Sequence, residues 1–196
     1  MKKQDFKFDR RASKYDKGFE GKLSRRFYRL IYKNIVLEKG DKVIDVGCGT
    51  GTILRTLADM EEISGYGIDV EPEMLKVARK RCFDMDIKEC SCEDTPYEGN
   101  TFDVMTACMA YHHFPDKDGF SEEAFRILKP GGLLYIADPN FPSLIRKLMN
   151  HIARRFNGEF LTGQEITERF RTYGFIPVNT KKDHYAQLVI LKKAEL

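Results

Sequence analysis

The sequence predicts an α/β fold in which helices cover both faces of a mostly parallel β-sheet that ends in an antiparallel hairpin. Two observations support it. Between residues 42 and 137, short apolar segments alternate with segments of helical periodicity, a pattern typical of strands and helices in turn. After Gly174, two strand-like segments are separated only by Lys-Lys-Asp-His, a connection too short for a parallel return.

The pattern yields seven strands and six helices. The predicted strands are Lys42–Val46, Tyr66–Val70, Asp86–Cys90, Phe102–Ala107, Leu133–Ala137, Phe175–Thr180 and Tyr185–Leu191. The predicted helices are Lys22–Val36, Ile53–Met60, Pro72–Arg81, Gly119–Leu128, Leu144–Phe156 and Thr162–Tyr173. Lys129-Pro130-Gly131-Gly132 is expected to stop the fourth helix, and Thr162 with Glu165 fits a helix N-cap.

Length and composition favour one domain with a small addition. The 196 residues divide into a helical leader or cap over residues 1–40 and a main domain over residues 41–196. No apolar stretch approaches the ~18 residues of a membrane span, and the charged N-terminus lacks the apolar core of a secretory signal. We therefore expect a cytoplasmic protein. The odd count of 5 Cys argues against a disulfide framework, and we expect no metal site.

Charge is distributed unevenly along the chain. Residues 1–40 hold 13 Lys and Arg against 5 Asp and Glu, a net charge of +8, which leaves −5 for the remainder. A basic arm can attract anionic partners such as RNA, although charges on a solvated helix face explain the same pattern. The sequence favours the solvated face.

A glycine-rich turn carries the strongest chemical signal. Strand residues lead directly into Gly47-Cys48-Gly49-Thr50-Gly51 and then a helix, where free backbone N–H groups favour a carboxylate or phosphate. A dinucleotide fingerprint would place its third glycine at position 52, which is Thr, and Asp45 would repel a pyrophosphate. Asp45 instead suits a ligand that carries ammonium and sulfonium charges.

Asp69 closes the second predicted strand, 18 residues after Gly51. An acid at that strand end can accept hydrogen bonds from both ribose hydroxyls of an adenosine-type ligand. Because nicotinamide and adenosyl ligands share this use, Asp69 alone does not separate the two classes. A helix-capping or surface role is the alternative for this residue.

Four blocks in this order resemble the class I S-adenosylmethionine-dependent methyltransferases, especially the small enzymes of the ubiquinone/menaquinone-biosynthesis type. The blocks are V-I-D-V-G-C-G-T-G (43–51), G-I-D-V-E-P-E-M-L (67–75), F-D-V-M-T-A-C-M-A-Y-H-H-F (102–114) and L-K-P-G-G-L-L-Y-I-A-D (128–138). The resemblance implies a Rossmann-like fold, S-adenosylmethionine as the cofactor, S-adenosylhomocysteine as its product, and a small-molecule methyl acceptor.

The resemblance also implies a cofactor site. Gly47, Cys48 and Gly49 would line the methionine part and Asp45 would orient its ammonium group. Asp69 would hold the ribose, and Ser91, where the family usually has Asp, would bind the adenine edge. The remaining implied contacts come from Val70 and Met74 beside the adenine, the Cys92 backbone, the Ala107 carbonyl and, from the leader, Tyr15.

Catalysis and acceptor choice are less constrained by the sequence. His112 and His113 follow the fourth strand, where either imidazole could act as a general base, although the pair also fits a structural role that the sequence favours. Asp138 faces the same rim or is simply a turn acid before Pro139. Residues 139–161 are expected to cover the acceptor, with a basic, apolar-striped helix that packs on the core or touches a membrane.

Three other functions stay open at this stage. A nicotinamide-dependent oxidoreductase conflicts with Asp45 and with the glycine spacing. A cofactor-binding module without catalysis would need the same binding residues. An RNA or protein methyltransferase is compatible with the basic arm, but the fourth strand ends in A-C-M-A, without the Pro-Pro-Tyr type of motif found in many enzymes that methylate DNA amino groups. The sequence predicts neither the acceptor atom nor the oligomeric state.

Overall fold

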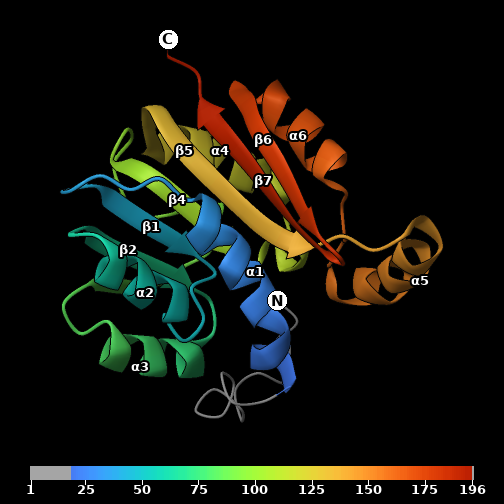
Figure 1. The fold of residues 1–196 in the computed structure, drawn as a ribbon, viewed down its shortest axis with the longest axis horizontal. Helices are drawn as coiled ribbons and strands as arrows, with labels where there is room; N and C mark the ends of the chain where they lie inside the picture. Colours follow the sequence, from blue (N-terminus) through green and yellow to red (C-terminus); the bar gives the residue numbers. More distant parts are fainter. Residues whose placement is uncertain (1–18, 196) are drawn as a thin grey trace.

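A computed structural model of the protein describes residues 19–195, with side chains from residue 23 onward. Seven strands form one sheet in the order β3-β2-β1-β4-β5-β7-β6 (Figure 1). All neighbours from β3 to β5 are parallel, and β7 runs antiparallel to both β5 and β6. The predicted α/β class, the strand count and the antiparallel hairpin are confirmed.

The elements follow the predicted alternation. The strands are β1 (Lys42–Val46), β2 (Ser64–Asp69), β3 (Asp86–Glu89), β4 (Phe102–Cys108), β5 (Leu128–Pro139), β6 (Phe175–Asp183) and β7 (Ala186–Lys193). The α-helices are α1 (Phe19–Asn34), α2 (Thr52–Met60), α3 (Pro72–Arg81), α4 (Lys117–Ile127), α5 (Ser143–Ala153) and α6 (Gly163–Thr172). Within residues 19–195, short 3-10 turns occur at η2 (Tyr111–His113) and η3 (Arg154–Phe156).

Apolar residues on the central strands supply both faces of the sheet. Side chains alternate in direction along a strand, so Val43 joins the cluster under α1, α2 and α3 while Ile44 joins the cluster under α4 and α6. The same alternation places Leu134 and Ile136 on the second face and Tyr135 on the first. Because both faces are covered, the central strands have near-continuous apolar runs.

Two connections differ from the prediction. Lys129-Pro130-Gly131-Gly132 does not simply separate α4 from a later strand, because Leu128 already pairs with Phe102 and β5 begins there. A register shift between the pairs Phe102–Leu128 and Val104–Leu133 accommodates the Pro-Gly-Gly residues as a bulge, with Gly131 at φ 79°. The expected loop Lys-Lys-Asp-His is also wrong, since β6 runs to Asp183 and turns only through His184 and Tyr185.

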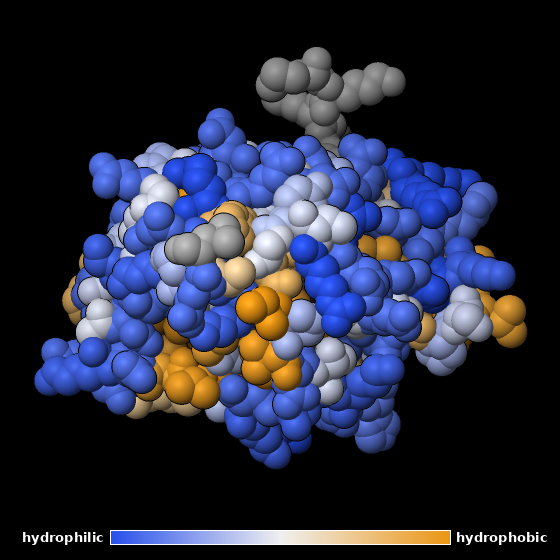
Figure 2. Space-filling view, turned by 90° about the horizontal axis from the view of Figure 1, so that it is seen from above, coloured by the Kyte–Doolittle hydropathy of each residue, from blue (hydrophilic) through white to orange (hydrophobic). Residues whose placement is uncertain are grey.

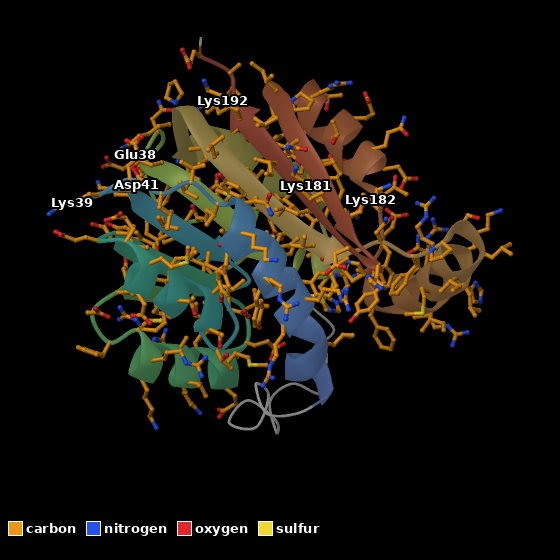
Figure 3. The ribbon with its side chains drawn as sticks, in the orientation of Figure 1. Glu38, Lys39, Asp41, Lys181, Lys182 and Lys192 are labelled. Atoms are coloured by element: carbon orange, nitrogen blue, oxygen red, sulfur yellow. The ribbon has the colours of Figure 1, made fainter. Side chains whose placement is uncertain are left out.

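Strand β6 is the outer strand beside β7. Its residues Lys181 and Lys182 are exposed and are labelled in Figure 3. Lysines on an exposed edge strand discourage its pairing with another chain. Among the described residues, no helix has the length and apolar character needed to cross a bilayer.

The predicted N-cap of α6 is present as a reciprocal pair of hydrogen bonds. The Thr162 hydroxyl accepts the Glu165 N–H at 3.2 Å, and the Glu165 carboxylate accepts the Thr162 N–H at 2.7 Å. Glu165 also forms an ion pair with Arg146 of α5. This cap therefore fixes both the start of α6 and the position of α5.

We expect Thr162→Ala to lower the free energy of unfolding by about 1 kcal/mol, because it removes the side-chain acceptor from the first turn of α6. Urea denaturation followed by circular dichroism measures the change. Thr172→Ala is the matched control, since its hydroxyl donates only to the Arg169 carbonyl at the exposed end of the same helix. Equal losses in the two variants would contradict the capping role.

Candidate functional site

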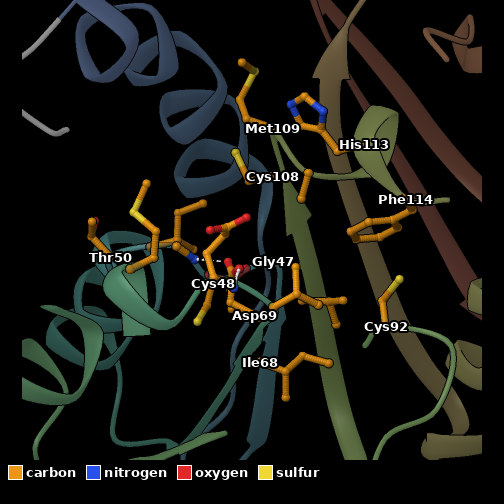
Figure 4. A pocket seen from close by; sticks show the side chains of 18 of the residues that line it. Gly47, Cys48, Thr50, Ile68, Asp69, Cys92, Cys108, Met109, His113 and Phe114 are labelled. Carbon is orange, nitrogen blue, oxygen red and sulfur yellow. Dashed lines mark hydrogen bonds between the residues drawn. The ribbon is translucent and has the colours of Figure 1, made fainter. Parts of the chain in front are cut away.

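A cavity of about 460 Å³ opens where β1, β2 and β4 end, beside α1 (Figure 4). The sheet order places β1 next to β4, so the connections after these two strands diverge to opposite faces and leave a crevice. Most of the residues implied by the resemblance line this cavity. They are Asp45, Gly47, Cys48, Gly49, Asp69, Val70, Met74, Ser91, Cys92 and His113.

The glycine turn requires backbone conformations that side chains disfavour. Gly47, Gly49 and Gly51 have φ of 71°, 53° and 73°. A Cβ on Gly47 would lie 2.5 Å from the Ala110 Cβ, whereas one on Gly49 would meet no atom within 4 Å. Gly47 is therefore needed for packing against the segment after β4, and Gly49 keeps the cavity wall open.

The turn is hydrogen-bonded to the end of β2. The N–H groups of Gly47 and Cys48 donate to the Ile68 carbonyl at 2.8 and 2.9 Å. The Gly49 N–H donates to Asp69 Oδ2 at 2.7 Å, and the Glu71 N–H donates to Asp69 Oδ1 at 2.9 Å. Burial nevertheless raises the pKa of Asp69, because desolvation outweighs these donors.

Asp45 lies in β1 and is 2% exposed. Its carboxyl has a pKa raised to about 7, because burial and, to a smaller extent, the nearby Asp69 carboxylate outweigh the lowering by the Thr106 hydroxyl, which donates to Oδ1 at 2.6 Å. Two acids in one cavity therefore create a site that favours a positively charged group. The role that the resemblance gives Asp45 stays a prediction.

The end of β4 contributes a second wall. Cys108, Met109 and Ala110 line the cavity, whereas Ala107 is fully buried inside β4 and is not among the lining residues. Met109 has φ of 55°, so the chain turns sharply where the strand ends. The implied role of the Ala107 carbonyl stays a prediction.

The two histidines of η2 occupy different environments. His113 lines the cavity, and burial lowers its pKa to about 3, helped by the neighbouring His112 and Lys117. His112 is not among the lining residues. Its Nδ1 lies 2.8 Å from Asp138 Oδ1, and its ring stacks on the Phe160 ring with 4.7 Å between the two ring centroids.

Asp138 is fully buried, so the alternative of a turn acid before Pro139 is wrong. Its Oδ1 faces His112, and its Oδ2 has no hydrogen-bond partner among the described residues. A carboxylate that accepts from Nδ1 fixes the orientation of an imidazole ring. Asp138 and Phe160 together hold His112 in place.

Sequence reasoning missed the contribution of α1. Leu23, Ser24 and Tyr28 line the cavity, and the fully buried Ser24 interrupts the apolar face of this helix, which was the available signal. The leader residue predicted to contact the cofactor, Tyr15, lies outside the described residues. Residues 139–161, the expected cover, contribute none of the lining side chains.

Comparisons with known proteins show what the chain is similar to. A demethylmenaquinone methyltransferase of Chlorobaculum tepidum is 33% identical over 118 residues, which are 59% of this chain and 49% of that protein. The chain thus spans about half the length of that relative. A ubiquinone/menaquinone biosynthesis C-methyltransferase of Geobacter sp. is 27% identical over 79% of this chain and 69% of that protein.

A solved structure from Haloferax volcanii shares the fold. It is a putative methyltransferase in complex with the Trm112 methyltransferase activator, with a TM-score of 0.83, 24% identity and coverage of 96% of this chain and 98% of that chain. Residues 37–189 match the family model described as a methyltransferase domain. Because that match spans most of the chain, this protein belongs to the methyltransferase domain family, whose members use S-adenosylmethionine as methyl donor.

Proposed function

We propose that this protein transfers a methyl group from S-adenosylmethionine to a small-molecule acceptor. The observation that carries the proposal is the convergence of Asp45, Asp69 and the Gly47–Gly51 turn on one cavity of about 460 Å³. The two buried acids suit the cationic groups and ribose of the donor and disfavour a pyrophosphate. Family membership supports the same donor.

In this proposal, Asp69 accepts hydrogen bonds from the ribose hydroxyls and Asp45 faces the ammonium group. Val70, which is 56% exposed, and the buried Met74 lie along the cavity on the side expected for adenine. Ser91 and Cys92 form the neighbouring edge of the cavity and would bind the adenine rim. The Tyr15 contact belongs to the same proposal.

The donor supplies a methyl group already activated by the sulfonium. The protein must then align the acceptor in line with the methyl group and exclude water. Such alignment can lower the activation barrier by several kcal/mol, with an upper range of ~7–11 kcal/mol. Leu23, Tyr28 and Met109 form an apolar part of the cavity wall that is suited to water exclusion. His113 stays neutral at pH 7 and can accept a hydrogen bond, but its pKa near 3 makes it a weak base.

We infer that the acceptor is a quinone-type or similarly hydrophobic small molecule. Two relatives carry names of quinone-pathway methyltransferases, and the apolar side chains beside His113 suit such a molecule. In this reading, residues 1–40 act as a cap over the cavity, and residues 139–161 approach the acceptor only from outside the described cavity. An RNA or protein acceptor and a non-catalytic module are the competing functions.

Asp69→Ala is expected to weaken S-adenosylmethionine binding at least tenfold, because it removes the proposed ribose acceptor. Isothermal titration calorimetry of the full chain with S-adenosylmethionine and, separately, NAD measures this, and only the first should bind. Asp59→Ala removes an exposed acid of α2 and should bind like the wild type. A second matched pair is Gly49→Arg, which should block the cavity, and Gly40→Arg, where φ is also positive but the residue does not line the cavity.

Equal binding by Asp69→Ala and Asp59→Ala would refute the ribose role of Asp69. Binding of NAD in place of S-adenosylmethionine would refute the proposed cofactor class.

Affinity for S-adenosylmethionine is expected to rise several-fold between about pH 6 and about pH 7.5. Asp45 has a folded-state pKa of about 7, so it is largely protonated at the lower pH and attracts the ammonium group only once ionised. In the free protein, the same raised pKa adds to the free energy of unfolding below about pH 4. This contribution is lost as the pH rises through 7. Asp45→Asn keeps an oxygen that accepts the Thr106 hydroxyl, and its affinity for S-adenosylmethionine should not change with pH. If the variant showed the same pH dependence as the wild type, the role of Asp45 would be contradicted.

We expect the protein to transfer a radiolabelled methyl group to the reduced form of demethylmenaquinone. We expect no transfer to RNA or to protein supplied at equal mass. His113→Ala should raise KM for that acceptor more than it lowers kcat, because a neutral His113 orients the acceptor more than it deprotonates it. Thin-layer separation of the labelled products measures both quantities. Label in RNA or protein alone would replace the proposed acceptor class, and no transfer to any acceptor by protein that binds the donor would favour the non-catalytic module.

A further inference from the structure

Helix α5 turns its apolar side away from the protein. Leu144, Leu148 and Ile152 follow each other at intervals of four residues and are 80%, 63% and 47% exposed. Ile145 beside them is 50% exposed, and no residue of α5 is buried. Figure 2 shows hydrophobic side chains at the end of the molecule where α5 lies in Figure 1. The expected alternative of a core-facing helix is therefore wrong.

The side of α5 that carries Arg146 and Asn150 faces the body of the protein and is held there by polar contacts. Asn150 accepts the Phe160 N–H at 2.7 Å and donates to the Phe160 carbonyl at 3.0 Å. Arg146 pairs with Glu165 in the cap of α6. Because these polar contacts are made toward the body, a rotation that buried Leu148 would break them, so the outward apolar row is a fixed feature of the fold.

A row of basic residues borders the apolar row. Lys147, His151 and Arg155 are exposed and also recur at intervals of four residues, next to Leu144, Leu148 and Ile152. Residues 143–156 contain no Asp or Glu. Among the ion pairs recorded for the described residues, Arg146 and Arg154 have acidic partners, while Lys147 and Arg155 have none. The surface therefore combines an aliphatic stripe with cations available for a partner.

We propose that α5 and η3 bind the surface of an anionic lipid bilayer. An amphipathic helix with an aliphatic face and basic flanks lies in the headgroup region, where apolar burial and attraction to anionic lipids act together. A second copy of the chain fits less well, because pairing two α5 helices would bring Lys147 and Arg155 toward their counterparts. Nucleic acid would match the charge but would leave the aliphatic stripe exposed.

This surface is independent of the proposed methyl transfer, because α5 contributes no residue that lines the cavity. It lies at the same edge of the sheet, since α5 follows the end of β5 and the cavity lies at the ends of β1, β2 and β4. S-adenosylmethionine binding can therefore be measured on the same variants as a separate readout.

Vesicle sedimentation of the full chain tests the proposal. We expect binding to phosphatidylcholine vesicles containing about one-third phosphatidylglycerol, and at least about tenfold weaker partitioning to phosphatidylcholine alone. Leu144→Ser/Leu148→Ser should lower partitioning at least about tenfold. The control Val36→Ser/Phe83→Ser removes two similarly exposed apolar side chains that do not belong to α5 and should bind like the wild type.

A second variant tests charge without altering the apolar row. Lys147→Gln/Arg155→Gln should weaken binding to the anionic vesicles and reduce its sensitivity to salt. The calorimetric affinity for S-adenosylmethionine should be unchanged in all variants, which also shows that they are folded. No binding to the anionic vesicles, equal loss in the control variant, or self-association that is abolished by Leu144→Ser/Leu148→Ser would overturn the proposal.

Discussion

The hydrogen bonds between the glycine turn and the end of β2 are the constraint on which the site depends. Ile68 accepts two N–H groups from Gly47 and Cys48, and the Asp69 carboxylate accepts the next one, from Gly49. The turn that makes these bonds has Gly47, Gly49 and Gly51 at positive φ, a conformation that glycine adopts with less strain than other residues. The bonds hold the ends of β1 and β2 at a fixed separation, so that the cavity wall is formed before any ligand binds. The close approach of Gly47 to Ala110 then ties the end of β4 to the same turn.

The second constraint is electrostatic. Asp45 and Asp69 lie in a region where desolvation raises the pKa of each, and the Asp69 carboxylate adds to the rise in the pKa of Asp45. Such a pair is unfavourable in the free protein when both acids are ionised and becomes favourable when cationic or hydroxyl groups approach. Under the proposed function, the buried carboxyl groups select a cationic ligand, which distinguishes the site from a phosphate site formed from the same type of glycine turn. His113, kept neutral by burial, adds no opposing positive charge to the cavity.

Local signals predicted most of the fold. The apolar run of β1 and the proline at the start of α3 gave their boundaries, and the Thr162–Glu165 pattern gave the cap of α6. Prediction failed where distant pairing overrides local preference. Pro130 and Gly131 signal a break, but pairing of Leu128 with Phe102 draws them into a bulged strand. The contact of His112 with Asp138 and the outward direction of the α5 apolar row depend on contacts made only after folding. The ends of parallel strands meet at one edge, which is why the site residues were more predictable than those of α1.

The most direct test of this account is a crystal structure of the protein with S-adenosylmethionine bound. The account predicts the ribose hydroxyls within hydrogen-bond distance of the Asp69 carboxylate, the ammonium group on the Asp45 side of the glycine turn, and the adenine between Met74 and the Ser91 edge. A ligand bound outside this cavity, or bound within it with its ribose away from Asp69, would contradict the claim that the buried acids and the glycine turn form the donor site.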